Sequence, residues 1–157
     1  MTSECNTALA FDSQQQLAID RCFDTKLRLV PVTGQAGTGK TSILKAIYYG
    51  FIERGYRTVL AAPTGKAAKR IQEATGIAAM TLHRLLEYSR PDEKNPKTGK
   101  PYGMTFPKRH QTNPLDYDVI LVDEYAMVSH EIHRNLMTAL PYAGLVRCFG
   151  DVNQLQP

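Results

Sequence analysis

The stretch of sequence that decides the fold is Gly34-Gln35-Ala36-Gly37-Thr38-Gly39-Lys40-Thr41. It matches the phosphate-binding pattern G-x-x-x-x-G-K-[ST] at every fixed position. Glycines in this pattern let the backbone curl until consecutive N–H groups face phosphate oxygens. The side chain of Lys40 is expected to reach the β- and γ-phosphates, and the Thr41 hydroxyl to bind Mg²⁺. We therefore predict that residues 34–42, with Ser42 as the last of them, hold a nucleoside triphosphate and Mg²⁺.

The residues on either side of this loop fit a strand-loop-helix unit. Apolar side chains among residues 27–32 predict a strand, and residues 42–47 begin a helix that runs to about Arg54, before Gly55. The positive end of that helix's dipole would lie near Lys40 and attract phosphate. A glycine-rich turn without a ligand is the alternative, and the agreement of both flanks with the pattern disfavours it.

Helix and strand patterns alternate along the rest of the chain, which is typical of an α/β fold with a mostly parallel sheet. A first helix is predicted after a cap at Asp12 or Ser13. Further strands are predicted at residues 58–62, 119–122 and 145–149, and further helices at residues 66–74, 82–88 and 130–140. Pro31 conflicts with this scheme, because proline lacks the N–H that a central strand needs. We expect a local distortion of the strand there.

Two adjacent carboxylates follow the predicted strand at residues 119–122. A strand of a parallel sheet carries Asp123 to the carboxyl edge, where open α/β folds bind their ligands. There Asp123 can hold Mg²⁺ together with Thr41, and Glu124 can act as the general base that orients the attacking water. A polar turn without a function is the alternative for the pair alone. Combined with the phosphate loop, the pair predicts phosphoryl transfer to water.

Length and composition fit one ordinary globular domain. The chain has 157 residues, of which 43% are hydrophobic and 22% charged. It contains neither an apolar run of about 18 residues nor an N-terminal signal peptide, so we expect a cytoplasmic protein without a membrane partner. Cys5, Cys22 and Cys148 are scattered, which favours reduced thiols over a disulfide or a zinc site.

The positive charge gathers in an inserted segment at about residues 89–114, which is rich in Pro, Gly, Lys and Asn. Between Tyr88 and Asn113 the chain has six basic and two acidic residues, which give the whole net charge of +4. Tyr88, Tyr102 and Phe106 lie among the basic residues, a pairing that suits single-stranded nucleic acid. A solvated loop without a partner explains the segment equally well. Residues 95–99 resemble the tip of a β-hairpin.

Three further turns have polar residues where a phosphate could bind. Thr64 and Lys66 follow one strand, and the segment from Thr81 to His83 begins a short helix, so both could contact a nucleic-acid backbone. Gln154 lies beyond the last strand, near the expected position of the γ-phosphate. Taken singly, each is better explained by a capped turn, a core helix with a satisfied His83, or a polar loop.

Taken together and in this order, the motifs resemble the first motor lobe of superfamily 1 DNA helicases of the RecD/Dda-like branch. The resemblance covers about residues 11–157. Its motifs are Phe-Asp-Ser-Gln-Gln, the phosphate loop, Ala-Pro-Thr-Gly-Lys-Ala-Ala, Thr-Leu-His-Arg-Leu-Leu, Asp-Glu-x-x-Met-Val and Gly-Asp-x-x-Gln-Leu.

This resemblance implies a RecA-like P-loop NTPase domain over residues 1–157, with helices on both faces of the sheet. It implies that Gln15 reads the adenine of ATP, that Lys40, Glu124 and Gln154 take part in hydrolysis, and that the enzyme is an ATPase of the helicase class. It also implies contacts to single-stranded DNA from Thr64, Lys66, Thr81 and His83. The insert at 89–114 would be a pin-like hairpin beside the duplex junction. The family moves 5′ to 3′, and a bacterial or phage-infected cell is the expected setting.

The chain also departs from the family pattern. Tyr125-Ala126 stands where the family usually has Ala-Ser, so a hydroxyl between the ATP site and the last motif is lost, and Gln156 replaces a common proline. The second RecA-like lobe, which supplies arginines to the phosphates, is expected to be absent. We therefore expect weak turnover by the chain alone.

Three alternatives remain open at this point. The chain could be a stand-alone regulator that binds nucleotide or DNA without turnover. It could be an unrelated P-loop ATPase or kinase, although the last two motifs disfavour this. A homo-oligomer or a partner chain could complete the site in trans.

Overall fold

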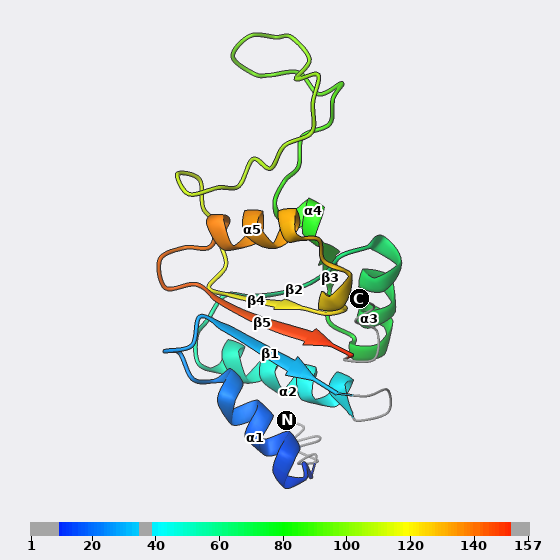
Figure 1. The fold of residues 1–157 in the computed structure, drawn as a ribbon, viewed down its shortest axis with the longest axis vertical. Helices are drawn as coiled ribbons and strands as arrows, with labels where there is room; N and C mark the ends of the chain where they lie inside the picture. The colour runs from blue at the N-terminus through cyan, green and yellow to red at the C-terminus, as the bar shows by residue number, and fades with distance from the viewer. Residues whose placement is uncertain (1–9, 35–38, 152–157) are drawn as a thin grey trace, which may run out of the picture.

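The computed structural model describes residues 10–34 and 39–151, and within them the chain forms one parallel sheet. The strand order is β1-β5-β4-β2-β3, and every pair of neighbours is parallel (Figure 1). The strands are β1 (Leu29–Thr33), β2 (Thr58–Ala62), β3 (Ala79–Thr81), β4 (Val119–Val122) and β5 (Leu145–Gly150). The predicted α/β class is confirmed, and the short β3 is an addition that the sequence pattern did not indicate.

Helices cover both faces of the sheet, as expected for a RecA-like P-loop fold. One face packs against α1 (Ser13–Cys22), α2 (Lys40–Glu53) and α3 (Gly65–Thr75), and the other against α4 (Leu82–Leu85) and α5 (His130–Ala139) (Figure 1). Side chains of β4 alternate between the two layers: Val119 and Leu121 enter the first, Ile120 and Val122 the second. Because β4 is buried on both sides, its sequence is a continuous apolar run.

Side-chain caps fix where the helices begin. Asp12, not Ser13, caps α1 in a reciprocal capping box, and Thr64, Thr81 and Ser129 cap α3, α4 and α5. The helix that was predicted to reach Tyr88 ends at Leu85. Glu87 adopts a left-handed backbone, with φ of 52°, which an α-helix cannot accommodate.

The prediction for Pro31 is wrong, because β1 is an edge strand among the described residues. Its only neighbour there is β5, and the register runs without a bulge from Leu29 to Thr33. Hydrogen bonds join Arg28 and Gly34 of this segment to β5. By alternation, Pro31 faces the free edge, where its missing N–H takes no bond from the ladder.

A buried arginine ties the first helix to the sheet. Arg147 on β5 is 0% exposed, and its guanidinium donates to the carbonyl oxygens of Cys22 at 2.7 Å, Leu27 at 2.8 Å and Asp24 at 3.1 Å. Burial lowers the pKa of Arg147. These bonds satisfy carbonyls in the turn between α1 and β1, and so fix α1 beside the strand that leads into the phosphate loop.

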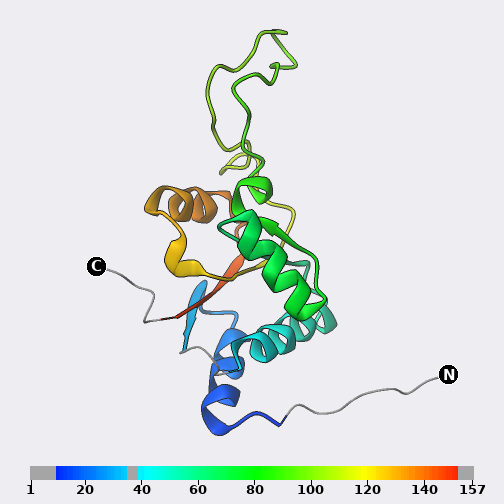
Figure 2. The same cartoon turned by 90° about the vertical axis from the view of Figure 1, so that its right-hand side faces the viewer.

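The insert at 89–114 projects away from the sheet as an out-and-back loop (Figure 2). It is held by isolated antiparallel bridges between Tyr88 and Pro107, Lys94 and Pro101, and His110 and Asn113, so regular hairpin strands do not form. Its prolines remove the N–H groups that a ladder needs. At the base, Arg109 pairs with Glu87 and Asp116.

Three of the insert's six cations form ion pairs within the protein, and the exposed Arg90 is one of them, with Asp92 at 4.0 Å. Lys108 pairs with Glu93 and Arg109 with the acids at the base, whereas Lys94, Lys97 and Lys100 are exposed and make no ion pair within the described part of the chain. Tyr102 and Phe106 pack edge to face, with ring centroids 4.9 Å apart. The available positive charge therefore lies toward the tip, and the aromatic rings pack against each other.

Among the described residues, none of the helices combines the length and the apolar character that a bilayer-spanning helix needs.

Candidate nucleotide and nucleic-acid site

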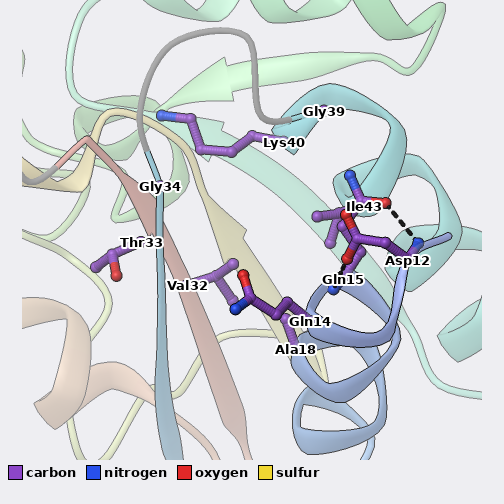
Figure 3. Close-up of a pocket in the computed structure, with 10 residues that line it drawn as sticks. All are labelled: Asp12, Gln14, Gln15, Ala18, Val32, Thr33, Gly34, Gly39, Lys40 and Ile43. Carbon is purple, nitrogen blue, oxygen red and sulfur yellow. Dashed lines mark hydrogen bonds between the residues drawn. The ribbon is translucent and has the colours of Figure 1, made fainter.

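The end of β1 and the start of α2 border a cavity of about 480 Å³ beside α1 (Figure 3). Lys40 is the first residue of α2, so its position follows from the strand-loop-helix unit that contains it. The cavity is lined by Asp12, Gln14, Gln15, Ala18, Val32, Thr33, Gly34, Gly39, Lys40 and Ile43. Apolar walls with two glutamine amides, one carboxylate and one cation suit a base and ribose attached to a phosphate chain.

Gln15 and Gly39 lie close together in the wall of this cavity. A Cβ on Gly39 would lie 2.9 Å from Nε2 of Gln15, and Gly39 has φ of 77°. The left-handed backbone is what requires glycine at this position, since the end of the flexible Gln15 side chain could move aside for a Cβ. The Gln15 Oε1 accepts a hydrogen bond from the Asp12 backbone N–H at 3.0 Å (Figure 3). The capping box thus holds Gln15 at the wall where the family resemblance expects an adenine contact.

A second cavity, of about 180 Å³, brings the two sequence motifs together. Lys40 and Thr41 from α2 line it opposite Asp123 and Glu124, which follow β4. Because Lys40 also lines the larger cavity, the two spaces are adjacent. The expected proximity of Thr41 and Asp123 is therefore present. Ser42 does not line either cavity.

The environment of Asp123 suits a cation. Burial raises the pKa of its carboxyl. A hydrogen bond from the Glu124 backbone lowers this pKa, the charge of the Glu124 side chain raises it, and the charges of Lys40 and Arg70 lower it. A bound Mg²⁺ would offset this unfavourable burial of negative charge. The described residues form no cluster of three or more His, Cys, Asp or Glu that could hold a metal. Mg²⁺ in nucleotide sites typically uses one or two protein oxygens together with phosphates and water, which Thr41 and Asp123 can supply.

Glu124 has a strained backbone. Its φ of 52° and ψ of 41° lie in the left-handed region, which costs a residue other than glycine about 1–3 kcal/mol. The residue then begins the short 3-10 helix η1 (Tyr125–Met127), which the sequence pattern did not predict. Strain of this kind persists where the surroundings hold it, and here it turns the Glu124 side chain into the wall that it shares with Lys40.

The two turns expected to contact DNA lie side by side at the carboxyl edge. Ala62 of β2 is the register partner of Thr81 on β3, so the turn at Thr64 and the turn at Thr81 follow adjacent strands. The Thr64 hydroxyl oxygen accepts a helix-capping hydrogen bond from the Ala67 backbone N–H at 3.1 Å. The Thr81 hydroxyl oxygen accepts one from the Arg84 backbone N–H at 3.1 Å. Each hydroxyl keeps its own proton, which is free to donate to a phosphate.

A cavity of about 330 Å³ lies beside the Thr64 turn. Thr64, Lys66, Ala67, Arg70, Glu124 and Met127 line it. Met127 is 58% exposed, so the cavity offers one apolar surface beside two cations. His83 does not line it; its ring is exposed and tilted against Tyr88, with centroids 4.6 Å apart. The structure therefore brings Thr64 and Lys66 together and leaves His83 outside that cavity.

The family departure at Tyr125 fills space on the other face of the sheet. Tyr125 hydrogen-bonds His133 of α5, and burial raises its pKa. Burial also raises the pKa of the neighbouring Cys148 thiol to about 12, so this thiol is inert at neutral pH. These residues border an apolar cavity of about 510 Å³ with Pro31 and Thr33. The tyrosine thus contacts α5 and not the nucleotide cavities.

Some predicted site residues lie outside the described part of the chain, and some cavity residues were not predicted. The predicted site residues outside the described part are Gln35, Ala36, Gly37, Thr38 and Gln154. The cavity residues that were not predicted include Gln14, Arg70 and Met127. Of these three residues, only Arg70 could have been found from the sequence, because it lies four residues after Lys66 and therefore on the same face of α3.

Comparison with known proteins identifies the family. A family model described as an AAA domain matches residues 15–157. The chain belongs to this family. Its relatives place this AAA domain in the RecD/Dda-like branch of superfamily 1 helicase motor domains, which confirms the resemblance seen in the motifs.

Two curated relatives and one solved structure show the extent of the match. The ATP-dependent RecD2 DNA helicase of Deinococcus radiodurans is 38% identical over 130 residues, covering 83% of this chain and 16% of the relative. The ATP-dependent DNA helicase dda of Enterobacteria phage T4 is 30% identical, covering 87% and 30%. The crystal structure of Pif1 helicase from Candida albicans shares the fold, with a TM-score of 0.57, 23% identity, and coverage of 91% and 33%. The chain thus spans at most about a third of each of these proteins.

Proposed function

We propose that this AAA domain is the ATP-binding and single-stranded-DNA-binding lobe of an ATP-dependent 5′ to 3′ DNA helicase. Hydrolysis would drive movement along DNA only when a second RecA-like lobe, from the same protein or a partner chain, completes the site. The observation that carries this proposal is the shared wall at Glu124, which lines both the cavity with Lys40 and the cavity with Thr64.

Nucleotide binding is assigned to the adjacent cavities beside α1 and α2. Gln15 would read the adenine, and residues 34–42 would surround the phosphates with backbone N–H groups. Lys40 lines both cavities, so its ammonium can reach the phosphate chain from the base of the loop. Gln154 would contact the γ-phosphate.

Hydrolysis requires an activated water. Thr41 and Asp123 would hold Mg²⁺, which neutralises charge on the phosphates when bound. Glu124 would accept a proton from the attacking water and orient it toward the γ-phosphate. Its strained backbone supports this assignment, because strain is concentrated at functional sites.

DNA binding is assigned to the two turns at the carboxyl edge. Hydroxyl donors at Thr64 and Thr81, with Lys66, would contact backbone phosphates, and His83 would contribute from the start of α4. The insert at 89–114 would act as the pin beside the duplex junction. The exposed Lys94, Lys97 and Lys100 near its tip supply charge for this contact.

A binding and turnover assay tests this proposal. The chain should bind MgATP and an oligothymidylate, yet hydrolyse ATP slowly with or without DNA. An arginine supplied in trans is worth about 10³–10⁵ in rate in related NTPases. The Lys40→Ala variant should lose MgATP binding and retain oligothymidylate binding. Fast, DNA-stimulated turnover that Lys40→Ala abolishes would show that the chain completes its own site. Failure of the wild-type chain to bind either ligand would overturn the proposal.

A further inference from the structure

Arg70 stands between the two cavities that the proposed function assigns to nucleotide and DNA. It lies on α3, four residues after Lys66, so both side chains project from the same face of the helix. Arg70 and Glu124 line both the cavity that contains Lys40 and Thr41 and the cavity that contains Thr64 and Lys66. No other residue is shared by these two cavities.

The guanidinium of Arg70 acts on Asp123 only through its charge, which helps to lower the pKa of that carboxyl. It makes neither an ion pair nor a side-chain hydrogen bond in the described part of the chain, and the residue is exposed. Three arginines elsewhere are already engaged by partners within the protein: Arg57 pairs with Asp118, Arg109 with Glu87, and Arg147 with backbone carbonyls. An arginine is always charged and presents five donors, so an unpaired one beside two cavities is available to an anion in either.

We propose that Arg70 is a positioning residue shared by two anion sites, the nucleotide phosphates and a backbone phosphate of single-stranded DNA. This inference rests on the proposed function and goes beyond it. Glu124 is the one carboxylate that lines both cavities together with Arg70. A nucleotide in the first cavity draws the guanidinium toward it, and a DNA phosphate in the second draws it the other way. One cation cannot neutralise both anions, so each ligand weakens the binding of the other.

This sharing has a thermodynamic signature. If MgATP lowers DNA affinity by some factor, DNA must lower MgATP affinity by the same factor. Coupling between two sites is typically about 5–150-fold, and a single shared cation belongs at the low end of that range. Long-range repulsion between the ligands contributes less, because salt screens charges that are about 8–10 Å or more apart.

The test measures that coupling in the 157-residue chain at constant salt. A labelled oligothymidylate of roughly a dozen nucleotides is titrated with protein, with and without a saturating non-hydrolysable ATP analogue and Mg²⁺. We expect the analogue to weaken oligothymidylate binding by about fivefold in the wild type. The reciprocal titration, with a fluorescent analogue, should give the same factor.

Three variants separate sharing from simple charge loss. Arg70→Ala should weaken each ligand separately and remove the coupling, whereas Arg70→Lys should keep part of it. Lys69→Ala removes a neighbouring exposed charge that lines neither cavity, and should keep the full coupling. Thermal unfolding checks that each variant is folded. Unchanged coupling in Arg70→Ala, or no coupling in a wild type that binds both ligands, would overturn the inference. Failure of the wild type to bind either ligand would instead overturn the proposed function.

Discussion

The carboxyl edge of the sheet and the insert at 89–114 place their charged residues by different means. At the edge, strand register and buried contacts determine where Asp123 and the Thr64 turn lie. In the insert, isolated bridges and partly exposed ion pairs do so, and the free lysines are far from any buried layer. Chemistry that needs accurate geometry thus lies on the rigid scaffold, whereas contact with a variable partner lies on a segment that can adjust.

The largest expected loss of stability comes from a substitution in the scaffold formed by the sheet and its helices. Arg147→Ala leaves the carbonyls of Cys22, Asp24 and Leu27 without their donor and opens a void in the core. Each unsatisfied buried acceptor costs about 1–3 kcal/mol, so we expect the free energy of unfolding to fall by about 3 kcal/mol or more. Urea denaturation measures this loss. A fall below about 1 kcal/mol would mean that water replaces the guanidinium and that the core does not depend on it.

A smaller effect is expected where the insert joins the scaffold. Arg109→Ala removes the pairs to Glu87 and Asp116 and the bond to the Pro114 carbonyl. Because these contacts are partly exposed, we expect a loss of about 1 kcal/mol. Limited digestion with trypsin should cut the insert several times faster, since its lysines become more accessible. Digestion at an unchanged rate would show that the bridges alone hold the insert.

The smallest effect compares one ion pair from each region. Arg57 hydrogen-bonds Asp118 between the starts of β2 and β4 and holds the pKa of that carboxyl below its ordinary value. A lowered pKa contributes stability that is present above the unfolded pKa of about 3.9 and is lost as the pH falls through the folded pKa. The Asp118→Asn variant should therefore be less stable than the wild type at pH 7, by under about 1 kcal/mol, and the difference should shrink in acid.

The insert provides the control for this pH dependence. Asp92 lies 4.0 Å from Arg90, and both side chains are largely exposed. Asp92→Asn should therefore leave the denaturation midpoint unchanged at every pH between 7 and 3.5. If Asp92→Asn changed the stability at each pH as much as Asp118→Asn does, the ion pairs of the scaffold and of the insert would not differ in their contribution to stability.

Sequence alone predicted the parts of the molecule that obey local rules. The apolar runs at β2 and β4 and the start of the first helix at Asp12 were located correctly, because burial and capping depend on adjacent residues. The pairing of Thr41 with Asp123 followed from two motifs whose strands end at the same edge.

What the sequence did not predict depends on which elements become neighbours. Pro31 was assigned to a central strand because the position of β1 in the sheet is a tertiary property. Arg147 looks like a surface cation until α1 packs over it. The shared position of Arg70 likewise requires α3 and the residues after β4 to be placed together.

The proline at the free edge of β1 has a consequence for association between molecules. A strand edge with a full set of N–H groups can pair with another chain and seed aggregation. Here the middle position of the outward-facing set Leu29, Pro31 and Thr33 offers no donor. A foreign strand added in register would lose its central hydrogen bond and meet the pyrrolidine ring. Pro31 therefore makes this edge a poor template for intermolecular sheet growth, at no cost to the pairing with β5.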